Sequence, residues 1–353
     1  MATTSEGHPY PSRRLIRSVL PLQLPARRCR AAPPPVLPFD AMSRVSRHPV
    51  TDATAVSLPL HPGDYELSLL IGNRTRTFLV HVPPQALDDS PLPVVVNFHG
   101  GGSNAQQQCQ YSGMNATADR HGFIVVYPNG TGVMPGQRRL LTFNAGGCCP
   151  PATRNSVDDV GFTETILSVL GEKIGVDPHR LYATGMSNGG MMAHRMAVDS
   201  SRIAAVASVA GQLNVKSFRP SRPVSVMEFH SVDDRRAVYE GGLGSRPSGN
   251  RFRFPPVQTG IDQWVAHNEC PHTPVIAETL TGAPGSLNEG QTVIKIAYGP
   301  GQDGAELVLY KFTGVGHVWP GSAMSLPILL GRATTLVDAN ETMWQFFAAH
   351  PLA

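Results

Sequence analysis

The sequence predicts an α/β protein with a mostly parallel central sheet, helices on both faces of that sheet and an N-terminal antiparallel hairpin. From residue 64 onward, short apolar runs alternate with longer helix-like stretches, as in chains that fold into parallel sheets. Two runs of alternating apolar and polar residues flank Gly72-Asn73, a pattern typical of a hairpin. The pentapeptide Gly185-Met186-Ser187-Asn188-Gly189 lies between a strand-like and a helix-like run, which is the setting of a tight turn that presents a serine.

The strands are expected in the following order. The two arms of the hairpin are residues 65–70 and 75–82. Residues 94–98 and 124–127 are short, continuous apolar runs of the kind found in buried parallel strands. Later strands are expected at residues 181–183, 204–209, 224–229 and 307–312.

Helix-like stretches separate these strands. They occupy residues 158–174, 190–198, 257–267 and 335–349. Asp158 and Asp159 stand at the start of the first stretch, where carboxylates cap a helix N-terminus and interact favourably with its dipole. We therefore expect both residues to support this helix and neither to act as a catalytic acid.

Composition and charge are those of an ordinary globular protein. The 353 residues suffice for one large domain, and we expect a single α/β domain over residues 56–353. A net charge of +3 gives no reason to expect nucleic acid as a partner. No apolar run approaches the ~18 residues that a membrane span needs, so no membrane partner is expected. The sequence leaves the oligomeric state open.

Residues 1–55 are expected to form a disordered or targeting leader. This segment is rich in arginine and proline and poor in acidic residues. Arg17 and Pro21 interrupt its apolar stretch, so a secretory signal peptide is poorly supported. An organelle transit peptide and a shorter chain that starts at Met42 are the alternatives.

The cysteines show no Cys-x-x-Cys spacing, so we expect no metal site. They are Cys29, Cys109, Cys148, Cys149 and Cys270. Adjacent cysteines do not readily bond to each other without strain, so a disulfide of Cys148 or Cys149 is expected to use a distant partner such as Cys270 or Cys109. The alternative is that all five are small buried apolar side chains.

Groups suited to nucleophilic catalysis surround the serine pentapeptide. A tight strand-to-helix turn would hold Ser187 in a strained backbone conformation, exposed at the edge of the sheet. Upstream, a predicted strand leads directly into His99-Gly100-Gly101-Gly102, a turn that leaves its backbone amides unhindered. The amides of Asn188 and Gly101 would form an oxyanion hole, with Gly102 as the next choice after Gly101.

An acid and a base follow the serine along the chain. The strand at residues 224–229 is followed by Asp233 and Asp234, either of which could hold an imidazole in the right tautomer. His317 lies in a glycine-rich loop after the last predicted strand, from which it could reach Ser187. The order serine, aspartate, histidine is that of α/β-hydrolases and differs from the orders in trypsin-like and subtilisin-like proteases.

Six motifs carry a family resemblance, and they occupy residues 97–102, 143–149, 157–162, 185–190, 230–242 and 314–321. In this order they resemble the polyhydroxybutyrate depolymerase-like esterases, which include feruloyl and acetyl xylan esterases of carbohydrate esterase family one. The resemblance implies an α/β-hydrolase fold and serine esterase activity without a metal or organic cofactor. It assigns Ser187 as the nucleophile, His317 as the base and Asp234 as the acid.

Substrate contacts are also implied by the resemblance. Trp319 corresponds to a family aromatic beside the catalytic histidine that suits an acyl or aryl pocket, with simple core packing as the alternative. Gly102 and His99 are further candidates for substrate binding, although the position of His99 at a strand end favours a structural hydrogen-bonding role. Phe143 stands where the family often has Trp, and Asp233 adds a second carboxylate, so substrate preference is left open.

The expected substrates are soluble esters, such as feruloyl or acetyl esters of plant saccharides or short hydroxyalkanoate esters. No serine- and threonine-rich linker or adsorption module is visible, which disfavours attack on crystalline polyester. The alternatives are a serine peptidase on the same fold and a catalytically silent binding protein. The resemblance suggests an extracellular location, with an organelle as the alternative.

Overall fold

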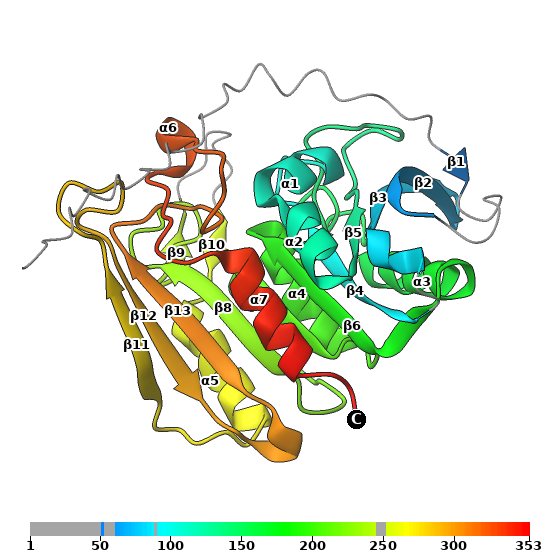
Figure 1. Ribbon diagram of the computed structural model, residues 1–353. Helices are drawn as coiled ribbons and strands as arrows, with labels where there is room; N and C mark the ends of the chain where they lie inside the picture. Colours follow the sequence, from blue (N-terminus) through cyan, green and yellow to red (C-terminus); the bar gives the residue numbers. More distant parts are fainter. Residues whose placement is uncertain (1–50, 53–60, 88–89, 245–251) are drawn as a thin grey trace, which may run out of the picture. The chain divides into compact units, whose positions relative to one another are not determined.

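The computed structural model describes residues 51–52, 61–87, 90–244 and 252–353. Within them, an eleven-stranded sheet has the order β1-β2-β3-β5-β4-β6-β7-β8-β13-β12-β11 (Figure 1). All neighbours from β5 through β4, β6, β7 and β8 to β13 are parallel, which confirms the predicted α/β class. These six strands are β5 Ile124–Pro128, β4 Leu92–Phe98, β6 Val176–Met186, β7 Ala205–Val209, β8 Ser225–Ser231 and β13 Leu307–Thr313.

Antiparallel strands flank this parallel centre. On one side β2 (Gly63–Ile71) pairs with β3 (Arg74–Val82), which confirms the predicted hairpin. On the other side β12 (Thr292–Tyr298) and β11 (Val275–Thr281) continue the sheet, and neither was predicted. Nearly every residue of β11 is exposed, so no buried face imposes an alternation on its sequence.

Two short segments complete the strands. β1 (Thr51–Asp52) pairs with β2 and falls within the range predicted for a leader. The rest of residues 1–55 lies outside the described residues. A separate antiparallel pair is formed by β9 (Gly242–Leu243) and β10 (Arg253–Phe254).

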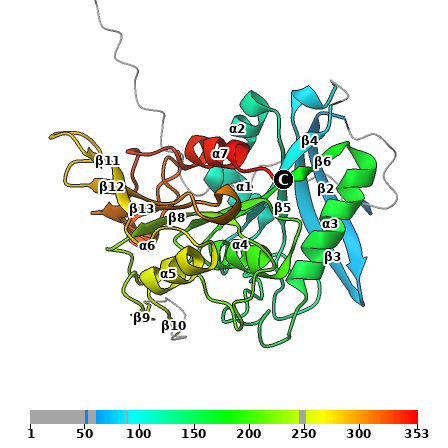
Figure 2. The same ribbon diagram turned by 90° about the horizontal axis from the view of Figure 1, so that it is seen from below.

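Helices cover both faces of the sheet, as predicted (Figure 2). On one face the apolar core is shared with α3 (Asp159–Lys173), α4 (Asn188–Asp199) and α5 (Val257–His267). On the other face it is shared with α1 (Ala105–Ser112), α2 (Met114–His121) and α7 (Ala339–Ala349). The short α6 (Pro327–Leu330) and the 3-10 turns η3 (Pro84–Leu87) and η4 (Gln302–Gly304) lie in connecting segments.

Local signals account for most helix boundaries. The Asp158 side chain caps α3 by accepting a hydrogen bond from the Gly161 amide at 2.8 Å, as predicted. Asp159 does not cap, because its buried carboxylate pairs with Arg76 at 2.6 Å and accepts from the Asn144 amide. The last helix starts later than predicted because Asp338 is its N-cap. The two helices α1 and α2 were not predicted, since both are short and polar.

Candidate active site

Ser187 sits in a strained turn between β6 and α4. Its backbone has φ 57° and ψ −119°, a conformation that non-glycine residues rarely adopt, and this confirms the predicted strain. The turn requires small neighbours, because a β-carbon on Gly189 would lie 2.1 Å from the Phe98 carbonyl oxygen and one on Gly185 would lie 2.6 Å from it. The Ser187 side chain is half-buried, whereas the sequence suggested an exposed position. The walls around it restrict how a substrate approaches.

Asp234 and His317, the predicted acid and base, lie in direct contact. The His317 Nδ1 atom lies 2.6 Å from Asp234 Oδ2, and the other carboxylate oxygen accepts from the Arg236 and Ala237 amides at 2.7 and 2.9 Å. Burial alone would raise the pKa of Asp234, but the charge and hydrogen bond of His317 outweigh it and the pKa is lowered. Asp234 is therefore held as a carboxylate.

The rival acid, Asp233, faces another way. Its side chain is exposed, and its Oδ2 atom accepts a hydrogen bond from the Gly314 amide at 2.6 Å. Adjacent residues after a strand point in different directions, so only one of the two carboxylates meets the imidazole. The geometry selects Asp234.

The carboxyl ends of β6, β7, β8 and β13 bring the serine and the acid–base pair to one edge of the sheet. These strands are consecutive parallel neighbours, and Ser187, Asp234 and His317 each follow one of them. Because Nδ1 of His317 is bonded to Asp234, its Nε2 atom is available for proton transfer. Among the hydrogen bonds of the described residues, none joins this nitrogen to Ser187 Oγ, and catalytic contacts of this kind often tighten only with substrate.

The two residues predicted to supply the oxyanion hole, Gly101 and Asn188, lie next to each other. Gly101 lies against Asn188, since a β-carbon on Gly101 would be 3.5 Å from Asn188 Cβ. Asn188 is the first residue of α4, where the amide has no partner inside the helix. The Gly102 amide is already bonded to the Leu141 carbonyl at 2.8 Å, so Gly102 cannot replace Gly101 in this role.

The Asn188 side chain is itself held in place. Its Oδ1 atom accepts from the Phe143 amide at 2.7 Å, and its Nδ2 atom donates to the Phe143 carbonyl at 3.1 Å. This two-point contact fixes the start of α4 against the segment that carries Phe143. The sequence offered no signal for this clamp, because the two residues are 45 positions apart.

His99 and Trp319, both candidates for substrate binding, are enclosed in the protein. Burial lowers the pKa of His99 to about 4, so its ring is neutral; Nδ1 bonds to the Gly100 carbonyl and Nε2 accepts from the Gly130 amide. This agrees with the structural role favoured for it. The Trp319 side chain is 1% exposed and donates from Nε1 to Asn340, which corresponds to the core-packing alternative.

A buried polar network lies behind Asp234. Glu228 of β8 contacts His230 Nδ1 at 2.8 Å and His194 Nε2 at 3.2 Å, and Trp264 donates to the remaining nitrogen of His194. His230 Nε2 lies 2.7 Å from the Ala237 carbonyl and 3.8 Å from Asp234. Both nitrogens of His230 face acceptors, so its ring donates twice and is a buried imidazolium.

The pKa values of this network agree with that charge. Burial lowers the pKa of His230, yet the hydrogen bond and charge of Glu228 and the charge of Asp234 raise it above its usual value. Burial raises the pKa of Glu228, but its two histidine partners lower it overall. The sequence analysis missed this network. A signal was present in Glu228, a charged residue inside an otherwise apolar strand.

One cysteine prediction is wrong. Cys148 and Cys149 are bonded to each other, whereas a distant partner was expected. Both are buried, and the Cys149 amide donates to the Phe143 carbonyl at 3.1 Å, so the disulfide packs next to the Asn188 clamp. Cys109 and Cys270 carry free thiols. Cys29 lies outside the described residues.

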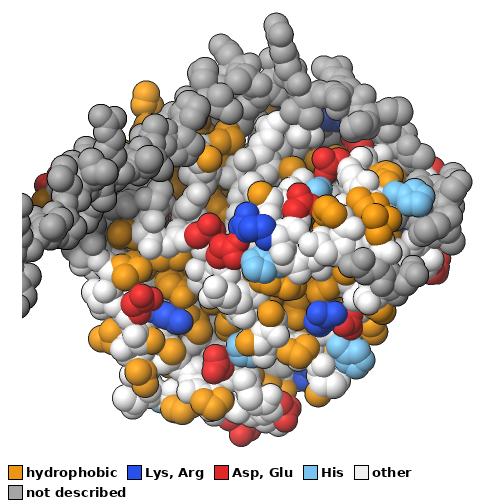
Figure 3. All heavy atoms as spheres, in the orientation of Figure 1, with side chains coloured by type: hydrophobic (Ala, Val, Ile, Leu, Met, Phe, Trp, Pro, Cys, Tyr) orange, Lys and Arg blue, Asp and Glu red, His pale blue; other side chains and the backbone are white. Residues whose placement is uncertain are grey.

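Metal sites, membrane-spanning helices and surface charge can also be assessed for the described residues. They contain no group of three or more His, Cys, Asp or Glu side chains arranged to hold a metal ion. None of their helices is both long enough and apolar enough to cross a membrane. On the face drawn in Figure 3, acidic and basic side chains are scattered among uncharged and apolar ones.

Comparisons with known proteins identify proteins that are similar to this chain. Residues 76–248, which include Ser187 and Asp234, match the family model of esterase PHB depolymerase. NocK of Nocardia uniformis subsp. tsuyamanensis, assigned as an esterase, is 27% identical over 332 residues, which cover 89% of this chain and 90% of NocK. Feruloyl esterase B of Piromyces equi is 28% identical over 205 residues, which cover 56% of this chain but only 37% of that protein.

A solved structure supports the same architecture. Acetyl xylan esterase from Aspergillus awamori superposes with a TM-score of 0.52 at 15% identity, covering 81% of this chain and 99% of that one. At this identity the likeness concerns the fold, which is that of α/β-hydrolases. Fold and relatives together define the chain as a carboxylic ester hydrolase. Its residues 76–248 are similar to the polyhydroxybutyrate depolymerase-like esterases, the family that its six motifs resemble.

Proposed function

We propose that Ser187, His317 and Asp234 form the catalytic triad of this serine esterase. The observation that carries the proposal is the 2.6 Å contact between His317 and Asp234 at the same sheet edge as the strained Ser187. His317 Nε2 takes the proton from Ser187 Oγ, and the oxygen attacks the ester carbonyl carbon. His317 then returns the proton to the departing alcohol, which leaves an acyl-serine.

Water completes the cycle. His317 removes a proton from water, the resulting hydroxide attacks the acyl-serine, and the proton returns to Ser187 as the carboxylic acid leaves. Asp234 holds the imidazole and stabilises its charged form in both halves of the reaction. The Gly101 and Asn188 amides would donate to the oxyanion of each tetrahedral intermediate. Support comes from their side-by-side position next to the serine.

Single substitutions at the two neighbouring aspartates test the triad. Asp234→Asn should lower kcat by a factor on the order of 10³ or more, because a neutral amide cannot stabilise the imidazolium. Asp233→Asn is the matched control and should retain most activity, since the amide oxygen can still accept from Gly314. Ser187→Ala should lose as much activity as Asp234→Asn. Equal losses at Asp233 and Asp234 would contradict the assignment.

The substrates we propose are feruloyl or acetyl esters of plant saccharides, with short hydroxyalkanoate esters as a second group. Support comes from the feruloyl esterase named among the relatives and from the family match. A panel of methyl ferulate, acetylated xylan, p-nitrophenyl esters and hydroxybutyrate oligomers would rank these groups by kcat/KM. Turnover of p-nitrophenyl esters alone, with none of methyl ferulate or acetylated xylan, would refute the feruloyl and acetyl esters as substrates.

A further inference from the structure

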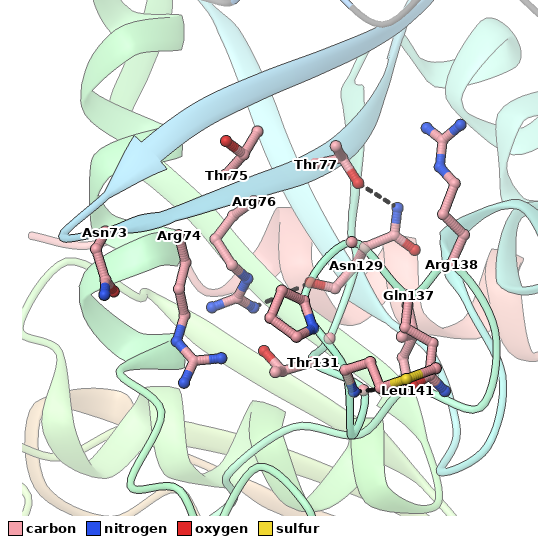
Figure 4. A pocket seen from close by; sticks show the side chains of 15 residues that line it. Asn73, Arg74, Thr75, Arg76, Thr77, Asn129, Thr131, Gln137, Arg138 and Leu141 are labelled. Atoms are coloured by element: carbon pink, nitrogen blue, oxygen red, sulfur yellow. Dashed lines mark hydrogen bonds between the residues drawn. The ribbon is translucent and has the colours of Figure 1, made fainter.

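A cavity of about 620 Å³ lies between the start of β3 and the segment after β5, and no residue of the proposed triad lines it. One wall consists of Asn73 in the hairpin turn and the first residues of β3. The other consists of residues in the segment from Asn129 to Leu141. Figure 4 shows the Arg74 and Arg76 side chains directed from β3 toward the segment that carries Asn129 and Thr131. The volume is within the range of small-ligand sites.

Three arginines give this cavity a positive character. Arg76 pairs with the buried Asp159 at 2.6 Å, and Arg138 pairs with Glu66. Arg74 has no carboxylate within ion-pair distance among the described residues and is exposed at the cavity. The cavity therefore has three guanidinium charges and two carboxylates paired with them, which leaves one positive charge in excess. A guanidinium can bind a carboxylate through two parallel hydrogen bonds.

Two buried polar atoms on the walls lack partners. Arg76 is 5% exposed and its Nε atom makes no hydrogen bond; Thr131 is 8% exposed and its hydroxyl makes none. Unpaired buried polar groups are costly, so the protein around this cavity leaves part of its hydrogen-bonding capacity unused. Both residues belong to the lining, Arg76 from β3 and Thr131 from the segment after β5.

The rest of the lining favours a hydroxylated ligand. Amides and hydroxyls such as those of Asn73, Thr75 and Gln137 line it together with the apolar Met134, Pro135 and Leu141, and it contains no aromatic side chain. A hydroxycinnamoyl ring would find no stacking surface here. Sugar hydroxyls, in contrast, match these donors and acceptors.

The cavity wall is tied to the proposed oxyanion loop. The Leu141 carbonyl accepts the Gly102 amide at 2.8 Å, and the Gly130 amide donates to His99 at 3.0 Å. Two hydrogen bonds therefore join the cavity wall to the loop that holds Gly101. This position suits the saccharide portion of a substrate whose ester group reaches Ser187.

We propose that this cavity is a subsite for a carboxylate-bearing saccharide, a uronate unit, with Arg74 as its main carboxylate contact. The choice of a saccharide rests on the proposed function, whereas the carboxylate follows from Arg74, whose charge no carboxylate of the described residues pairs. The exposed Asn73 and Thr75 side chains of the lining would bond to the sugar hydroxyls. The neighbouring ester would then be presented to Ser187.

Calorimetric binding to the full-length Ser187→Ala protein tests the subsite without turnover. An acidic xylo-oligosaccharide that carries a glucuronate branch should bind at least about tenfold more tightly than the neutral oligosaccharide of the same length. Arg74→Gln should remove most of this difference. Arg139→Gln removes the same charge from an exposed neighbour outside the lining and should leave the difference intact.

Three results would overturn the proposal. These are equal affinity for the acidic and neutral sugars, equal losses in the Arg74 and Arg139 variants, and binding of inorganic phosphate as tight as that of the acidic sugar. The last would mean a simple anion site. The proposed esterase function is tested separately. It fails if the unsubstituted protein does not hydrolyse any ester of the panel.

Discussion

The buried pair of Glu228 and His230 provides the sharpest test of how the site is supported. Their contact is 2.8 Å long, and the two side chains are 1% and 0% exposed. Removing one member of a buried ion pair costs about 3–5 kcal/mol, because the other charge is left without a partner. His230→Gln leaves Glu228 only its longer contact with His194 at 3.2 Å, so it should lower the free energy of unfolding by about 3 kcal/mol, the lower end of that range.

Removing both charges together should cost much less. In the double variant Glu228→Gln/His230→Gln, two neutral amides replace the pair and can hydrogen-bond to each other. Urea unfolding of the four proteins at pH 5.5 gives a double-mutant cycle, and we expect a coupling free energy of about 2 kcal/mol or more. Single effects that add to the double effect within about 0.5 kcal/mol would refute a charged pair.

The pH dependence of the same pair follows from its pKa shifts. The pKa of His230 is raised in the folded state, so its stabilisation is complete below about pH 6.5 and is lost as pH rises through the raised value. The pKa of Glu228 is lowered, so its stabilisation is complete above about pH 4.5 and is lost as pH falls through the lowered value. The stability advantage over the double variant should be largest between these limits. A constant difference from pH 4 to 9 would contradict this.

Three further predictions concern the elbow, a surface histidine and a helix cap. Gly189→Ala should lower the free energy of unfolding by about 3 kcal/mol and abolish activity, because the new β-carbon would lie 2.1 Å from the Phe98 carbonyl oxygen. The control is Gly171→Ala in α3, where the β-carbon would meet open space. This variant should raise the free energy of unfolding by roughly 0.5–1 kcal/mol in the same urea assay. Burial lowers the pKa of His81 but two carboxylates raise it overall, so the protein should lose thermal stability from pH 6 to 8, and a His81→Gln variant should lose less. Asp158→Ala should cost about 1 kcal/mol of unfolding free energy, since α3 loses its cap; an unchanged urea midpoint would refute that role.

Much of the fold could be predicted because its signals are local. The hairpin strands appear as alternating apolar and polar residues, and the parallel strands appear as continuous apolar runs. Their apolar residues are buried as expected. The elements that were missed have weak local signals: β11 is exposed, and α1 and α2 are short and polar. Asp159 looked like a capping residue because of its position in sequence, but Arg76 from the hairpin determines its orientation.

The sequence by itself determined the order of serine, aspartate and histidine, the glycines around Ser187 and the strands that each group follows. These features depend on turn chemistry and hydrophobic periodicity, which neighbouring residues decide. Only the tertiary structure decided that Asp234 and not Asp233 meets His317, 83 residues away, and that the Gly102 amide is already engaged. It also decided that Glu228 pairs with the buried His230. The reason is physical: the direction of a side chain and the partner of an amide depend on packing between distant segments.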